Sequence, residues 1–424
     1  MIRLLIPMIF LLLALLSGCK TADEKTVSSK PDSSANRSAS LFSTIGDVTP
    51  NKGSAASSTL GELETRMLIQ QFVKRRSDIN QVLRASQQME LDLQRMPGKF
   101  RYTDVYQQKA EEIKKQKEAE KKDLQTYYKE LDLLAYKFRV YEERTPSGVW
   151  KLTEFYNAFE PSASPENKPY WDEYTANIEN WISQNPESPT PRIVLAYVLI
   201  KRAWAHRTTL PARHVNPEAW KAFEYFVSQA RNYLEQNKVM ASEDPHWYAM
   251  MAIVAMAEGW PLEKFLALIE EGTNRYPYYY QTYFNGMNYL LPRWQGSNEK
   301  MEAFANAAVE KTREKDKTGL YARVYWAASG TIKKHRLFAD SGVVWEKMRQ
   351  AIFDVLEQYP DQWNYNNFAY FACMAKDRET TKMLTNQVKI PINSVWETAE
   401  VFDVCRSWGN GQDSGLLDMM LGNR

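Results

Sequence analysis

Apolar residues in the first half of the chain recur at seven-residue spacings, which predict two long helices. Residues 62–96 carry two offset series of such spacings, and residues 106–141 carry two more. Pro97-Gly98 between them breaks a helix, because proline lacks a backbone donor and glycine is conformationally free. Two long amphipathic helices joined by a short turn bury their stripes together, so a helical hairpin is predicted over residues 62–145.

From residue 170 onward the chain has one helix-length pattern after another, separated by Pro, Gly or Asn-Pro. Alternating apolar and polar runs are almost absent, so strands are not expected and an all-α fold is predicted. Several helix pairs begin at a proline or glycine next to aromatic residues. These starts are Thr190-Pro191, Pro245-His246-Trp247-Tyr248, Pro277-Tyr278-Tyr279-Tyr280, Thr318-Gly319-Leu320-Tyr321 and Pro360-Asp361-Gln362-Trp363.

The spacing of these starts suggests a helical repeat. Pro245 to Pro277 is 32 residues, Pro277 to Thr318 is 41, and Thr318 to Pro360 is 42. These intervals bracket the tetratricopeptide period of about 34 residues, although the tetratricopeptide consensus is not met. Tyr276-Pro277 and Tyr359-Pro360 close two helices in the same way. We therefore predict a tetratricopeptide-like α-solenoid over residues 146–410, followed by a C-terminal tail over residues 411–424.

One run in this region resembles a known family. Leu290-Leu291-Pro292-Arg293-Trp294-Gln295-Gly296-Ser297, followed by Met301-Glu302-Ala303-Phe304-Ala305 and Gly319-Leu320-Tyr321-Ala322-Arg323-Val324-Tyr325-Trp326, is similar to a bacterial family of unknown function with tetratricopeptide-like helices. The similarity covers roughly residues 170–388. It implies helical repeats and association with the cell envelope, and it brings no catalytic residues.

The same run predicts a corner between two helices. Pro292 ends or kinks one helix, Gly296 supplies a backbone conformation that other residues avoid, and Ser297 caps the next helix. Arg293 and Trp294 then lie in this corner, either packed there or as a cation-π pair that faces a ligand.

The sequence of the N-terminus predicts a targeting signal. Arg3 is followed by an apolar run that is too short to span a membrane but suits a secretory signal, predicted over residues 1–18. Leu16-Ser17-Gly18-Cys19 resembles the lipobox of bacterial lipoproteins, and this resemblance implies that Cys19 becomes the lipid-carrying N-terminus; an ordinary signal peptide with a chance cysteine is the alternative. Lys20, in place of an aspartate, favours the periplasmic face of the outer membrane over the inner membrane.

Composition and charge predict a flexible segment and argue against several classes of protein and partner. Residues 19–61 hold the lipidated cysteine and a serine-rich stretch with few apolar residues, which predicts a flexible tether. The chain has 54 basic and 52 acidic side chains, a net charge of +2, so nothing favours nucleic acid as a partner. At 44% hydrophobic residues it is neither collagen-like nor wholly disordered.

The sequence offers little catalytic chemistry. None of the four histidines, His206, His214, His246 and His335, lies three or four residues from another, and no phosphate loop, nucleophile elbow or dinucleotide motif occurs. We therefore expect no enzyme, metal or cofactor.

Cys373 and Cys405 lie 32 residues apart, close to one repeat period, so they either form a disulfide or are buried free thiols.

Most of the many aromatic residues are expected in the helical core, and some are expected to line a concave binding groove. Tyr278, Tyr280, Tyr283 and Asn285 are the candidates for groove residues, beside Arg293 and Trp294. The predicted function is a non-catalytic envelope lipoprotein, held on the membrane through Cys19, whose repeats bind another envelope protein or a peptide. The alternatives are a peptidoglycan- or glycan-binding protein, a cell-wall hydrolase, and a purely structural spacer.

Overall fold

The computed structural model describes residues 88, 91, 104–161, 163–208, 212–294, 296–332, 334–396, 398–412, 415 and 417. Helices make up most of this part of the chain, which contains no β-strand and only an isolated antiparallel bridge between Arg144 and Trp150. The all-α prediction is confirmed. The predicted signal peptide, tether and first arm of the hairpin lie outside the described residues, apart from residues 88 and 91, which are helical. No described helix is long and apolar enough to cross a membrane.

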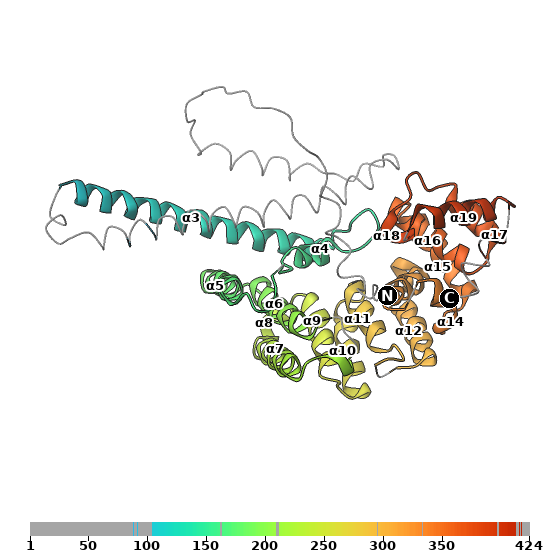
Figure 1. Cartoon of the computed structure of the whole chain (residues 1–424), viewed down its shortest axis with the longest axis horizontal. Coiled ribbons are helices and arrows are strands. Elements are labelled where there is room, and N and C mark those ends of the chain that lie inside the picture. Colours follow the sequence, from blue (N-terminus) through green and yellow to red (C-terminus); the bar gives the residue numbers. More distant parts are fainter. Residues whose placement is uncertain are drawn as a thin grey trace, which may run out of the picture.

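The long helix α3 (Asp104–Val140) corresponds to the second arm of the predicted hairpin. Most of its apolar stripe is buried as the spacing predicts, but Ala110 is only partly buried and Tyr141, just past its end, is exposed. The buried stripe contains Ile113, Leu124, Tyr127, Leu131, Leu134 and Phe138. The helix packs on α4 (Lys151–Asn157) and α5 (Lys168–Gln184), and its N-terminal half extends well away from the rest of the described protein (Figure 1).

The remaining helices form pairs in series, and the predicted starts of the pairs are confirmed. The pairs are α6 (Thr190–Arg207) with α7 (Pro217–Gln236), α9 (His246–Ala257) with α10 (Leu262–Arg275), α11 (Tyr280–Tyr289) with α12 (Asn298–Asp316), α13 (Gly319–Ser329) with α15 (Trp345–Gln358), and α16 (Gln362–Met374) with α17 (Arg378–Thr385). Short elements connect them: η3 (Ala212–His214), α8 (Lys238–Ala241), η4 (Lys334–Arg336), α14 (Leu337–Asp340) and α18 (Asn393–Trp396). The array ends in α19 (Ala399–Gly409).

Two of the second helices end in the same way, as their Tyr-Pro pairs predict. Tyr276, after α10, has φ −134° and ψ 70°, and Tyr359, after α15, has φ −132° and ψ 70°. The following proline disfavours the helical region for the residue before it, so the chain leaves the helix at the tyrosine. The next pair starts a few residues later in both places.

The first helices of successive pairs lie on the inside of a curve. α9 packs directly on α11, and α11 on α13, whereas α10, α12 and α15 pack mainly on first helices. Figure 1 shows an arc with α6, α9, α11 and α16 along its inner side and α7, α10 and α12 along its outer side. We call α6, α9, α11, α13 and α16 the inner helices. They run in the same direction because helices within a pair are antiparallel, so their N-terminal ends share one edge of the array and their C-terminal ends share the other.

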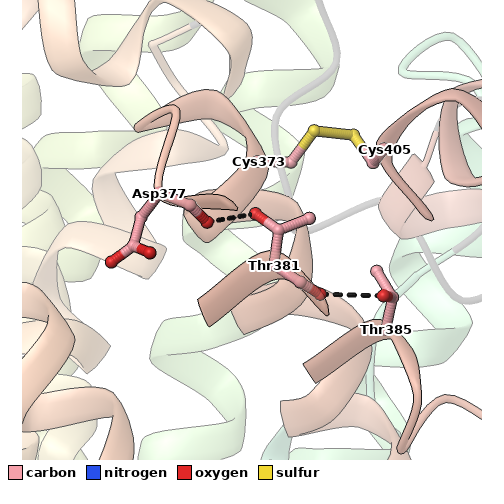
Figure 2. Close-up of a disulfide and its surroundings, with 5 residues drawn as sticks. All are labelled: Cys373, Asp377, Thr381, Thr385 and Cys405. Atoms are coloured by element: carbon pink, nitrogen blue, oxygen red, sulfur yellow. Dashed lines mark hydrogen bonds between the residues drawn. A yellow bond between two sulfur atoms is a disulfide. The ribbon is translucent and has the colours of Figure 1, made fainter. Parts of the chain in front are cut away.

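A disulfide between Cys373 and Cys405 joins α16 to α19, with the two Cα atoms 5.7 Å apart (Figure 2). Beside it, on α17, the Thr381 hydroxyl donates to the Asp377 carbonyl, and the Thr385 hydroxyl donates to the Thr381 carbonyl. Both threonines are buried, and these bonds satisfy their hydroxyls within the helix. The C-terminal end of the array is thus closed by a covalent bond and a small polar core.

Candidate functional site

The chain between α3 and the first pairs lies across the N-terminal ends of the inner helices. We call residues 141–157, the loop after α3 together with α4, the connecting segment. Its residues contact the start of α9 through Asp244 and His246, the start of α11 through Tyr279, α13 through Arg323 and α16 through Asn364. One segment therefore holds four helix pairs in register, and its geometry marks it as the candidate site.

Side chains on the inner helices hold the loop by its backbone. The buried Arg323 guanidinium donates to the Ser147 carbonyl at 2.7 Å, and the Asn364 amide donates to the same oxygen at 3.1 Å. Arg144 donates to the Gly148 carbonyl at 3.0 Å. Gly148 has φ +91°, and a Cβ there would lie 2.4 Å from the Arg323 guanidinium. The site therefore holds a tight turn of the loop at close range, and a side chain at position 148 would not fit.

Tyr280 lies between two of these cations. The guanidinium carbon of Arg144 is 4.6 Å from the centre of its ring, and that of Arg323 is 5.2 Å away. Its hydroxyl donates to Asp316 at 2.8 Å. Burial lowers the pKa of Arg323, but Tyr280, Tyr359 and Asp316 oppose that effect. The ring and the carboxylate thus stabilise the buried Arg323 and the partly buried Arg144.

The expectation that Tyr280, Tyr283 and Asn285 line an exposed groove is wrong, because the structure buries all three. The Asn285 amide donates to the Ala249 carbonyl on α9, and Tyr283 packs near Phe304 of α12. They fill the interfaces between α11 and its neighbours because α11 is enclosed on several sides. Tyr278 is only partly buried, with the Lys315 ammonium 4.1 Å from its ring centre.

A second polar cluster joins α3, α4 and α9 around the fully buried Asp244. Its carboxylate accepts from the Arg139 guanidinium at 2.8 Å, from the Tyr156 hydroxyl at 2.7 Å and from the His246 backbone amide at 2.9 Å. Burial is the largest single influence on the Arg139 pKa and acts to lower it, but Asp244 and the nearby tyrosines together outweigh it, so that pKa is raised. A buried charge is stable only when it is paired and fully hydrogen-bonded in this way.

His246 lies at the centre of this cluster. Its ring stacks on Tyr156 with centres 4.2 Å apart, and its Nδ1 lies 2.6 Å from the Tyr279 hydroxyl. The Thr153 hydroxyl donates to that same tyrosine oxygen, so the tyrosine proton points to Nδ1 and the imidazole is neutral with its proton on Nε2. Complete burial lowers the pKa of His246 to about 3.

This burial makes stability depend on pH. Below pH 6.5 the unfolded chain takes up a proton at His246 and the folded chain does not, so stability falls by about 1.4 kcal/mol per pH unit down to about pH 3. Between pH 6.5 and 5.0 the wild-type protein should lose about 2 kcal/mol more than His246→Asn, measured by urea unfolding. Equal losses in both proteins would contradict the assignment.

Removing the Arg323 donor should loosen the loop locally. In Arg323→Met, amide exchange over residues 144–150 should accelerate roughly tenfold or more, because the lost charged hydrogen bond contributes about 1.5 to 3 kcal/mol. Arg313→Met on α12, which loses only an exposed pair with Glu310, is the matched control and should leave this exchange unchanged. Unchanged exchange in Arg323→Met would show that the loop is held by other contacts.

Arg293 and Trp294 lie in the predicted corner between α11 and α12. Arg293 is exposed, Trp294 is partly buried, and the guanidinium carbon lies 5.5 Å from the indole centre. The Ser297 hydroxyl accepts from the Lys300 amide and caps α12, as the sequence predicts. Gly296 is needed for a different reason from the one expected: a Cβ there would lie 1.6 Å from the Leu290 carbonyl oxygen, so close packing and not an unusual φ requires glycine.

Two tryptophans on neighbouring inner helices lie outside the contacts with the connecting segment. Trp326 on α13 and Trp363 on α16 are both partly exposed and meet edge to face, with ring centres 6.4 Å apart. The Trp326 Nε1 donates to the Asn367 side chain at 3.0 Å, which fixes the ring. The structure thus offers an ordered aromatic surface there.

Sequence reasoning missed the residues that build this site, although two had a local signal. Arg323 stands alone among apolar residues of a helix, and Asp244 directly precedes the proline that starts α9. Their partners are distant in sequence, so the pairing itself left no pattern. Among the described residues, no group of three or more histidines, cysteines and carboxylates is arranged to hold a metal ion.

Comparisons with known proteins add no further assignment. The sequence matches no protein-family model, no curated protein and no solved structure. The resemblance carried by the Leu290–Ser297 run stays a prediction.

Proposed function

We propose that this protein is a non-catalytic lipoprotein of the cell envelope, anchored through Cys19 at the periplasmic face of the outer membrane, whose helical array binds another protein or a peptide. The observation that carries this proposal is the recognition of the Ser147 main-chain carbonyl by two inner-helix side chains, those of Arg323 and Asn364. Helical repeats bind partners on extended concave surfaces, and side chains that hold a main-chain carbonyl of this chain are of the kind that hold a bound peptide.

Two further features support the proposal. The partly exposed Trp326 and Trp363 give the inner side of the arc the ordered aromatic surface that anchors protein partners. The disulfide between Cys373 and Cys405 fits a chain that folds in an oxidising compartment outside the cytoplasm.

Site-specific photo-crosslinking in intact envelopes tests the binding surface. A benzoylphenylalanine in place of Trp363 should form a defined adduct, and the same group in place of the exposed Met383 on α17 should not. The Trp363 adduct should weaken in a Trp326→Ala background, because that change removes the neighbouring indole. No adduct from position 363, or identical adducts from both positions, would contradict the proposal.

The anchor has its own test. Cys19→Ala should abolish incorporation of labelled palmitate and release the protein into the soluble fraction, since acyl chains provide the membrane affinity. Wild-type protein that never incorporates the label would overturn the anchoring proposal and leave the crosslinking result unaffected.

A further inference from the structure

The edge opposite the connecting segment carries a repeated pairing of a cation with an indole. Beside the end of α6, the Arg207 guanidinium carbon lies 5.2 Å from the centre of the Trp220 ring. Beyond the end of α9, the Lys264 ammonium lies 3.4 Å from the Trp260 ring centre, and beyond the end of α11 Arg293 lies over Trp294. We call these six residues the cation–indole edge.

The three pairs lie on neighbouring parts of the array. α6 packs on α9, and the Tyr289 hydroxyl at the end of α11 donates to the Trp260 carbonyl at 2.5 Å. Burial first, and then the nearby charge of Arg207, lowers the pKa of Arg293, so these two guanidiniums are close in space. The three cation–indole pairs therefore lie near one another at this edge of the array.

Among the described residues, two of the three cations of this edge are not paired with a carboxylate. In the described part of the chain, neither Lys264 nor Arg293 forms an ion pair, and both side chains are exposed. Glu258, the nearby acid, pairs with Arg231 at 2.9 Å and accepts from the Trp260 Nε1. The three indoles are partly exposed, so ring faces and cations are presented together.

Helix stability does not explain this arrangement. A cation in the last turn of a helix complements the helix dipole, which accounts for Arg207. Lys264 lies in the first turn of α10, where the dipole disfavours a positive charge, and Arg293 lies in the corner after α11. The helix dipole therefore does not account for two of the three cations.

We propose that the cation–indole edge binds an anionic oligosaccharide whose sugar rings stack on the indoles and whose carboxylate or phosphate groups pair with the cations. A flat indole packs against the apolar face of a sugar ring, and a guanidinium forms two parallel hydrogen bonds with a carboxylate or phosphate. Several such pairs close together suit an oligosaccharide that carries more than one anionic group. The proposal does not depend on the protein partner, which the inner side of the arc would hold.

Calorimetric titration of the full chain tests the proposal with ligands that separate charge from stacking. Hexagalacturonate supplies carboxylated sugars, phosphorylated maltohexaose supplies phosphorylated ones, maltohexaose supplies neutral ones, and linear hexaphosphate supplies charge without sugar. At least one anionic hexasaccharide should bind roughly tenfold or more tightly than either maltohexaose or hexaphosphate, because only it uses both kinds of contact. Higher salt should weaken the binding.

Substitutions then locate the site. Arg293→Gln and Trp294→Leu should each raise the Kd roughly tenfold, since each removes one half of a pair. Arg378→Gln is the matched control, because its guanidinium lies 5.1 Å from the Trp408 ring at the far end of the array. No saturable binding of either anionic hexasaccharide, equally tight binding of maltohexaose or hexaphosphate, or an equal loss in Arg378→Gln would overturn the proposal.

Discussion

Replacing Asp244 by alanine is expected to lower the free energy of unfolding by about 3 to 5 kcal/mol. The change removes the carboxylate that accepts from Arg139, Tyr156 and the His246 amide, and it leaves the guanidinium without its buried partner. A buried charge that loses its hydrogen-bonded counter-charge costs far more than an exposed one, because water cannot replace the lost contact. Urea unfolding at pH 7.5 measures the effect.

Asp172→Ala is the matched control for this prediction. Asp172 pairs with Lys168 on the surface of α5, and both side chains are more than half exposed. Such a pair contributes about 0 to 1 kcal/mol, so its loss should hardly change the unfolding midpoint. Similar destabilisation in the two variants would show that the Asp244 cluster is not the link between α3, α4 and α9 that its geometry indicates.

The helices of the array were predictable because residues next to each helix end determine where the helix begins or ends. Thr190-Pro191, Pro245-His246 and Thr318-Gly319 each give the start of an inner helix to within a residue, and the Tyr-Pro pairs end two outer helices. Proline and glycine act on the backbone of their own neighbourhood, so a single sequence is enough to read them. Helical periodicity then supplied the rest of the all-α fold.

The site was not predictable because its contacts join distant parts of the chain. Arg323 and Ser147 are 176 residues apart, and Asn364 reaches the same carbonyl from 217 residues away. The choice of Tyr280 and Tyr283 for a groove failed for a related reason: an aromatic cluster at the start of a helix does not reveal how many neighbours surround that helix. Only the packing of α9, α11 and α13 decides which ring faces inward.

The disulfide could be predicted from the sequence only in part. A separation of 32 residues, close to one repeat period, left both a disulfide and two buried thiols open. The structure brings the two Cα atoms to 5.7 Å because α19 packs on both α16 and α17 and so returns to the inner helix of the preceding pair. The repeat period identified Cys373 and Cys405 as a candidate pair, and the chain brings them together because it turns back through α18.

Reduction of this disulfide is expected to lower the free energy of unfolding by about 3 to 4 kcal/mol, the chain-entropy value for closing a loop of this length. Chemical unfolding with and without dithiothreitol measures the loss, and the double variant Cys373→Ala, Cys405→Ala should show at least the same loss and no further response to dithiothreitol. Because α17, α18 and α19 lie at the end of the array, the C-terminal helices should open first in hydrogen exchange after reduction. Two free thiols in the denatured, unreduced wild-type protein would show that the bond does not form.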